Sequence, residues 1–427
     1  MPEPVIKSQT LYRARYLLPI VSPLMEDGAV LVESGLIRAA GAYRQLAAAH
    51  PAAGLVDFGD AVLMPPMVNA HTHLELSSFA DWAAEAGEPQ PPVDFVDWVL
   101  WLVRIRRGLD EKQLRVSLEA GLKASLLAGT GAVGDILTTL SAVDAYLGSP
   151  LHGRVFAEVL GQDLALVEER LSSIKALGVT PPAQNLRWGL SPHAPYSLSA
   201  AATDHIFAFA KEFTLQCSVH LAESPAESEF LQDGTGAIAE KLYASAGWDP
   251  LATPPPACSP VSALCREGRL KAGDMVIHGV QVDTADLECL KRSGCCVTLC
   301  PRSNAALNVG KAPVDAYLKA GIPLALGTDS LASSGSLSLW EEMAFAFDWF
   351  AGEAEPCTWI ETATLGGARA LGLQGRMGQL VPGHEASFQI VRLPDMPNAE
   401  ALEETLCLSG KDVEVTHLYL AGENVLP

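Results

Sequence analysis

The sequence has few basic residues for its length. Its 427 residues include 29 lysines and arginines against 50 aspartates and glutamates, so the formal net charge is −21. A field this acidic repels the phosphate backbone of nucleic acids and the surface of anionic membranes. We therefore expect neither a nucleic acid nor a membrane as a partner.

Long apolar runs and paired cysteines are also lacking. Apolar stretches such as 98–103 are far shorter than the roughly 20 residues that a membrane-spanning helix needs. The first residues, MPEPVIKSQT, lack the basic head and apolar run that are typical of a signal peptide. The nine cysteines are odd in number and form no CxxC pair, which favours buried thiols in a reducing cytoplasm.

Apolar residues, in contrast, are plentiful enough for a large core. They make up 49% of the chain, and the low charged fraction of 19% argues against a disordered protein. The length suits either one large α/β barrel with additions or two to three ordinary domains.

The middle of the chain repeats a short apolar run followed by a helical pattern. Eight such runs occur, over residues 62–70, 131–136, 155–160, 186–190, 215–219, 275–278, 295–299 and 323–326. Helical patterns lie between them, for example over 92–107 and 111–128. Eight strands that alternate with helices predict a parallel (β/α)₈ barrel, and continuous apolar strands suit a sheet that is buried on both faces.

The two ends of the chain hold short strand-like pieces instead. Neither end could bury a face alone, so we expect both to form one small β-sandwich beside the barrel. The predicted domains are therefore a composite β-sandwich of residues 1–60 plus 376–427 and a catalytic barrel of residues 61–375.

Histidines and an aspartate stand at the ends of these predicted strands. His71 and His73 follow the first run, and residues two apart in a strand point the same way. Three more histidines and one aspartate each close a different run: His193, His220, His278 and Asp329. Because a barrel gathers the carboxyl ends of its strands at one mouth, these side chains should converge there.

This composition is typical of a catalytic metal site. Two histidines from one strand, a third from another and an aspartate would surround a metal and leave one position for water. Glu223, three residues after His220, suits a proton shuttle between the attacking water and the leaving group. His278 could hydrogen-bond the reacting oxygen, and Asp329 could accept the proton of the water.

The motifs resemble the amidohydrolase superfamily, in its cytosine, adenosine and guanine deaminase and chlorohydrolase branch. The matching segments are VNAHTHLE, SPHAPYS, VHLAES, VIHGV, LCPRSN and LGTDS, and they follow that branch's order over essentially the whole chain. The resemblance implies one divalent metal, zinc with iron as the alternative, held by His71, His73, His220 and Asp329. It further implies catalysis by Glu223, His278 and Asp329, with substrate contacts from His193.

The chain departs from part of the superfamily pattern. Binuclear relatives use a carboxylated lysine on a middle strand, and the run 154–159 offers no lysine. Glu158 could bridge a second metal there, but the resemblance favours a single one.

Two longer motifs narrow the expected substrate. HTHLELS and CPRSN resemble the amidohydrolases that deaminate 6-aminodeoxyfutalosine, an adenine nucleoside carrying a benzoate, in menaquinone synthesis. Arg302 of CPRSN could bind that carboxylate with two hydrogen bonds; a salt bridge to a neighbouring loop is the alternative. The spacing of Trp98, Trp101 and Arg104 places them on one helix face, which favours packing over a substrate lid.

Other functions of the same fold stay open. They include a guanine or S-adenosylhomocysteine-type deaminase, a triazine chlorohydrolase and a catalytically inactive scaffold. For each enzyme the substrate is a small molecule, and we further expect a homodimer.

Overall fold

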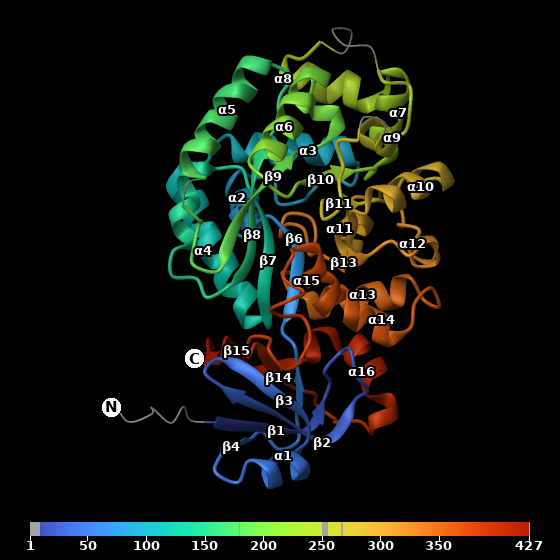
Figure 1. The fold of residues 1–427 in the computed structure, drawn as a ribbon. Helices are drawn as coiled ribbons and strands as arrows, with labels where there is room; N and C mark the ends of the chain where they lie inside the picture. Colours follow the sequence, from blue (N-terminus) through green and yellow to red (C-terminus); the bar gives the residue numbers. More distant parts are fainter. Residues whose placement is uncertain (1–8, 179, 250–254, 266–267, 427) are drawn as a thin grey trace. The chain divides into compact units, whose positions relative to one another are not determined.

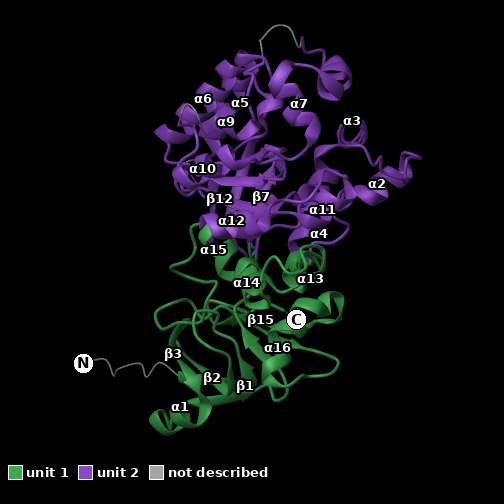
Figure 2. Ribbon diagram, turned by 90° about the vertical axis from the view of Figure 1, so that its right-hand side faces the viewer, with its two compact units in different colours: residues 1–68, 125–132, 338–427 green, residues 69–124, 133–337 purple. Residues whose placement is uncertain are grey.

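The computed structural model describes residues 9–178, 180–249, 255–265 and 268–426 (Figure 1). The chain divides into two compact units, which Figure 2 colours separately. Unit 1 comprises residues 1–68, 125–132 and 338–427, and unit 2 comprises residues 69–124 and 133–337. Unit 1 thus includes more of the chain than the predicted segments 1–60 and 376–427, whose boundaries stay a prediction.

Eight strands form the predicted barrel. They are β6 (Met67–Thr72), β7 (Thr130–Leu137), β8 (His152–Val159), β9 (Leu186–Pro192), β10 (Ser218–Leu221), β11 (Met275–His278), β12 (Cys296–Leu299) and β13 (Leu324–Leu326). They pair as two four-stranded sheets, β6-β7-β8-β9 and β10-β11-β12-β13. Parallel bridges between Leu190 and Cys217 and between Thr72 and Asp329 join these sheets at both edges, which closes the ring.

Helices connect the barrel strands, as the alternating pattern predicted. They are α2 (Phe79–Glu85), α3 (Phe95–Arg106), α4 (Glu111–Leu127), α5 (Leu164–Leu177), α6 (Ala200–Glu212), α7 (Pro225–Asp233), α8 (Ala244–Ala246), α9 (Pro260–Cys265), α10 (Thr284–Ser293), α11 (Pro301–Ala306) and α12 (Val314–Ala320). Short 3₁₀ helices are η1 (Leu74–Leu76), η2 (Leu140–Tyr146) and η3 (Pro195–Ser197), and the π-helix η4 spans Ile238–Tyr243. Helices α5 and α6 pack on β8 and β9, respectively, and cover the outside of the barrel (Figure 1).

The first predicted run, residues 62–70, differs from the expectation of one strand. It divides into β5 (Val62–Met64) and β6, with Pro65 and Pro66 between them. Proline has no N–H to donate to a sheet and its φ is fixed, so two successive prolines interrupt the pairing. As a result, β5 belongs to a different sheet from β6.

Strands from both ends of the chain form one eight-stranded sheet in unit 1. They are β1 (Gln9–Leu17), β2 (Met25–Glu33), β3 (Leu36–Ala42), β4 (Gly54–Asp57), β5, β14 (Phe388–Arg392), β15 (Glu414–Leu420) and β16 (Glu423–Asn424). Antiparallel pairing of β5 with β14, through Leu63 and Ile390, joins the two ends. Strands from both ends thus share one sheet, which also includes β5 from the run predicted for the barrel, whereas the two-layered sandwich stays a prediction.

Helices complete unit 1. They are α1 (Tyr43–Ala49), α13 (Leu339–Trp349), α14 (Pro356–Glu361), α15 (Gly367–Ala370) and α16 (Leu402–Ser409), with the short helices η5 (Thr362–Gly366), η6 (Ala399–Ala401) and η7 (Gly410–Asp412).

In the described part of the chain, no helix combines the length and apolar character that crossing a membrane would require. All nine cysteines are free thiols; six are buried as expected, whereas Cys265 and Cys289 are half-buried and Cys357 is exposed.

We expect Gly153→Ala to lower the melting temperature more than Gly161→Ala. The two glycines lie at opposite ends of β8 and have positive φ values of 125° and 128°. A Cβ atom at Gly153 would lie 1.9 Å from the carbonyl oxygen of Val133 on β7, whereas Gly161 faces open space. Backbone strain costs about 1–3 kcal/mol at either position, and a steric clash adds about 1–3 kcal/mol at Gly153 alone.

Differential scanning calorimetry of both variants separates these two contributions. Gly161→Ala is the matched control, because it reports the strain of a positive φ without the clash. Equal melting temperatures for the two variants would contradict the close approach of β7 and β8.

Candidate metal centre and active site

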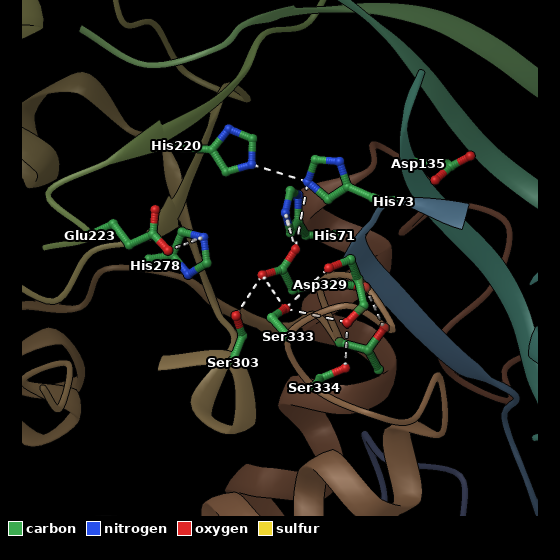
Figure 3. Close-up of polar contacts among 12 residues, drawn as sticks. His71, His73, Asp135, His220, Glu223, His278, Ser303, Asp329, Ser333 and Ser334 are labelled. Carbon is green, nitrogen blue, oxygen red and sulfur yellow. Dashed lines mark hydrogen bonds and ion pairs between the residues drawn. The ribbon is translucent and has the colours of Figure 1, made fainter. Parts of the chain in front are cut away.

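Four predicted metal ligands converge at the carboxyl ends of three barrel strands (Figure 3). Nε2 of His73 lies 3.3 Å from Nε2 of His220. Oδ1 of Asp329 lies 3.7 Å from Nε2 of His71 and 3.6 Å from Nε2 of His73. The ligand atoms of the three histidines lie within 4.8 Å of one another, which is a suitable spacing for one shared cation.

The chemistry of this group fits a metal ion. His71 is fully buried, yet neither of its ring nitrogens hydrogen-bonds to any described residue. Burial lowers the pKa of His71 to about 4 and that of His73 to about 3, so both are neutral imidazoles, the form that binds metals. Nδ1 of His220 lies 3.0 Å from the carbonyl oxygen of His193, and donation there leaves Nε2 as the ligand atom.

Asn69 and Gly327 hold the first and last strands of the barrel together at this point. The Asn69 side chain donates to Oγ1 of Thr328 (2.7 Å) and accepts from the Thr328 backbone N–H (3.1 Å). A Cβ atom at Gly327 would lie 2.7 Å from Cβ of His71, so a glycine is needed for this approach. The local sequences NAH and GTD therefore position His71 against Asp329.

Asp329 is held by two serines that the motifs did not single out. Ser303 donates to Oδ2 of Asp329 (2.6 Å), and Ser333 donates to the same oxygen (3.0 Å). Oδ1 remains directed at the histidines (Figure 3). Burial alone would raise the pKa of Asp329, but the neighbouring His71 and His73 keep it well below its usual value, so the carboxylate is ionised.

Glu223 and His278 form a second pair beside the metal-ligand group (Figure 3). Oε1 of Glu223 lies 3.5 Å from Nε2 of His278. Burial, together with the nearby Asp329 and Glu227, raises the pKa of Glu223 well above its usual value, which favours its protonated form. Nδ1 of His278 lies 2.9 Å from Oδ1 of Asn304, and with Nδ1 as the donor Nε2 faces Glu223 without a proton.

Two further carboxylates position the loops that follow β6 and β10. Oε2 of Glu227, on α7, accepts from the backbone N–H of Glu223 (2.8 Å). Asp135, on β7, accepts from the backbone N–H of Leu74 (2.8 Å) and from the hydroxyl of Tyr146. The bond to Glu227 fixes the backbone at Glu223, and the bond to Asp135 fixes the backbone next to His73.

His193, which follows β9, lies beside Glu158. Nδ1 of His193 hydrogen-bonds with Oγ of Ser197 (2.8 Å), and Glu158 accepts from Thr138 (2.7 Å). Ligand atoms of Glu158, His193 and His220 lie within 4.8 Å of one another, so the geometry allows Glu158 to approach the metal-ligand group. A second metal at Glu158 stays an untested alternative.

Arg302 is the predicted site residue that the structure leaves outside this group. A cavity of about 360 Å³ borders His73, His193, His220, Glu223, His278 and Asp329, and Arg302 is not among its lining residues. Arg302 is half-buried in the first turn of α11, whereas its neighbours Ser303 and Asn304 are buried and contact Asp329 and His278. The motif CPRSN therefore does contribute to the site, but through Ser303 and Asn304.

Helix α3 contributes more to the site than the packing face that the sequence suggested. Trp101 is buried in a core cluster, and Arg104 is exposed and pairs with Glu88. Trp98, however, lines the cavity together with Arg106.

Some of the missed residues had a recognisable signal. Ser224 and Glu227 match the S-x-x-E pattern of a helix start, and Ser224 does accept from the Glu227 backbone N–H (3.2 Å) at the beginning of α7. Ser333 and Arg106 had no comparable signal, since their place in the site depends on how distant segments pack.

Comparison with known proteins identifies the family. Residues 62–425 match the model of the amidohydrolase family. The chain is 32% identical over 356 residues to an aminodeoxyfutalosine deaminase of Deinococcus radiodurans, with 81% of each chain covered.

Two solved structures share the fold. The aminofutalosine deaminase of Helicobacter pylori in complex with methylthio-coformycin has a TM-score of 0.84 at 24% identity, with 98% of this chain and 100% of that chain covered. A zinc-bound adenosine deaminase of Xanthomonas campestris has a TM-score of 0.76 at 23% identity, with 98% and 93% covered. The family match and the similarity to the Deinococcus deaminase together show that the chain belongs to the amidohydrolase family and is a hydrolase that acts on C–N bonds.

Proposed function

We propose that this enzyme is a metal-dependent deaminase of an adenine nucleoside, with 6-aminodeoxyfutalosine as its substrate. The reaction exchanges the purine amino group for an oxygen atom of water and releases ammonia. The observation that carries the proposal is the buried Glu223 beside the metal-ligand group, because its raised pKa provides a proton donor for a ring nitrogen. The Deinococcus relative supports the choice of substrate.

In this proposal His71, His73, His220 and Asp329 hold one divalent metal, with zinc favoured by the zinc-bound Xanthomonas structure. When bound, the metal supplies Lewis-acid chemistry that activates water near neutral pH. Histidine nitrogens and one carboxylate suit zinc, whereas iron is the alternative that metal analysis distinguishes.

The side chains around the metal move and hold the protons. Asp329, ionised and held by Ser303 and Ser333, accepts a proton from the attacking water. Glu223 donates its proton to the purine nitrogen next to the carbon that loses ammonia, while Nε2 of His278 orients the Glu223 carboxyl group. Asp329 then passes its proton to the departing amino group, which leaves as ammonia, and Glu223 regains a proton from the hydroxyl group left on that carbon. His193, fixed by Ser197, contacts the purine from the side of β9.

An ammonia-release assay tests the reaction and its main alternatives. We expect purified enzyme to release ammonia from adenine nucleosides, with the highest kcat/KM for 6-aminodeoxyfutalosine. S-adenosylhomocysteine, guanine and an aminated triazine represent the other candidates. A preference for any of these would replace the proposed substrate, and ammonia from none of the compounds would support the inactive scaffold.

We expect His71→Ala to lose the metal and the activity together. The substitution removes one of four proposed ligands from a fully buried position, so the remaining shell is incomplete. Inductively coupled plasma mass spectrometry should find about one metal per wild-type chain and much less in the variant. His205→Ala, at an exposed position paired with Glu168, is the control that should keep its metal. Two metals per active wild-type chain would contradict the mononuclear site and implicate Glu158.

We expect Glu223→Gln to keep the metal but to lower kcat by about 10²- to 10⁴-fold, since an amide has a similar shape and cannot transfer the proton. Steady-state kinetics combined with metal analysis measure both effects. Glu229→Gln, an exposed change on helix α7, which follows the Glu223 loop, should leave kcat unaltered. Near wild-type turnover of Glu223→Gln would remove Glu223 from the mechanism.

A further inference from the structure

The cavity beside the proposed metal site has a largely apolar wall. Its apolar lining comes mostly from α3 and from the segment 242–248, and includes Phe95, Trp98, Leu102, Val103, Leu242 and Trp248. A cavity of this character suits an aromatic or otherwise apolar part of a ligand. The purine alone does not account for this wall, because the proton donor that would contact the purine is Glu223, which lies in the loop after β10 and belongs neither to α3 nor to the segment 242–248.

Helix α3 extends from one side of the barrel mouth to another. At its amino end, the rings of Phe95 and Tyr196, in the loop after β9, have centroids 6.3 Å apart. At its carboxyl end, Nη2 of Arg106 donates to Oε1 of Glu75 (3.0 Å) and to Oγ1 of Thr139 (2.8 Å), in the loops after β6 and β7. A helix of 12 residues is about 18 Å long, so α3 can follow the length of an extended substrate.

One face of α3 changes from apolar to cationic toward its carboxyl end. Trp98, Leu102 and Arg106 are four residues apart, which places them in one row along the helix, and all three line the cavity. Arg107 lines the cavity as well. Within the described part of the chain, these two arginines are the only lysine or arginine side chains in the lining.

Both arginines retain hydrogen-bond donors for a ligand. Among the described residues, Arg106 is bonded through Nη2 alone, which leaves Nε and Nη1. Arg107 is exposed, and no carboxylate of the described residues pairs with it. A planar guanidinium group matches a carboxylate with two parallel hydrogen bonds.

The charges around this end of the cavity leave a positive excess. Glu75 is paired with Arg106. Glu158 lies beside Arg170: the Arg170 Nε donates to the Glu158 backbone oxygen (2.9 Å), and the charge of the Glu158 carboxylate acts to raise the pKa of Arg170 against the effect of burial. Arg107 is then one positive charge without a counterpart, although the chain as a whole has a net charge of −21. An anionic group on a ligand would be repelled by most of this protein and attracted here.

We propose that Arg106 and Arg107 bind a carboxylate on an aromatic substituent of the substrate, while Trp98 and Leu102 contact the aromatic ring. The inference rests on the proposed function, because it concerns the part of an adenine nucleoside that extends from the purine along α3. The sequence suggested Arg302 as the residue that binds the substrate carboxylate; the inference assigns that role to Arg106 and Arg107 instead.

The test compares an adenosine that carries a 5′-linked benzoate with the methyl ester of the same compound. The readout is the ratio of kcat/KM for the acid to kcat/KM for the ester. Arg106→Met should lower this ratio about 10- to 100-fold, since a charge-assisted hydrogen bond is lost in a partly buried position. Arg106→Lys, which keeps the charge without the planar fork, should fall between that variant and the wild type. Arg107→Met should lower the ratio about two- to fivefold because Arg107 is exposed.

Arg104→Met is the matched control. Arg104 also lies in the last turn of α3 and therefore has the same effect on the helix dipole, but it pairs with Glu88 and does not line the cavity. Its ratio should equal that of the wild type. Should Arg106→Met lose its fold or metal, Arg107→Glu keeps the test decisive, since reversing this charge should lower the ratio further than Arg107→Met does, and an unchanged ratio would contradict the inference.

Two outcomes separate this inference from the function on which it rests. If wild-type enzyme deaminates acid and ester with equal kcat/KM, or if Arg302→Met lowers the ratio and both α3 variants do not, the inference is wrong and the deaminase assignment stands. If wild-type enzyme with its metal releases no ammonia from any adenine nucleoside, both are wrong.

Discussion

Closure of the barrel between β6 and β13 is the constraint on which the rest of the site depends. Asn69 and Thr328 exchange two hydrogen bonds across this seam, and the backbone N–H of Asp329 donates to the carbonyl oxygen of His71 (3.1 Å). Gly327 allows the strands to approach to a distance that any larger side chain would prevent. Because His71 and His73 come from the first strand and Asp329 follows the last, closure of this seam brings three of the four proposed metal ligands together, and His220 joins them from β10.

The same strand ends store backbone strain. Ala222, His278 and Asp329 have positive φ values of 54°, 72° and 57°, a conformation that costs a non-glycine residue about 1–3 kcal/mol. Surrounding hydrogen bonds hold it in place, such as those from the backbone N–H groups of Val280 (2.8 Å) and Gln281 (2.7 Å) to the Ala222 carbonyl oxygen. At each strand end this bend directs a functional group toward the mouth of the barrel. The rigid strand ends therefore fix the orientation of Glu223, His278 and Asp329.

Sequence reasoning predicted the part of the molecule that local rules determine. Continuous apolar runs identified all eight barrel strands. The rule that strand ends meet at one mouth was enough to group His71, His73, His220 and Asp329, whose side chains do lie together. The rule failed where the chain turns directly into a helix. Cys300 is the N-cap of α11, so the residues that follow are distributed around a helix, and Ser303 and Asn304 face the site in place of Arg302.

What the sequence could not predict is where α3 lies, because its position depends on contacts between distant segments. Arg106 enters the site through Glu75 and Thr139, and Trp98 through its packing beside Ala332. Strand-end residues such as Asp329 are fixed by several bonds at once, whereas most of the α3 residues that line the cavity are held by apolar packing. A change on α3 can therefore alter the shape and charge of the cavity without disturbing the hydrogen bonds of the reacting groups. In our proposals, the chemistry belongs to side chains at the ends of the barrel strands, whereas the choice of substrate depends mainly on α3.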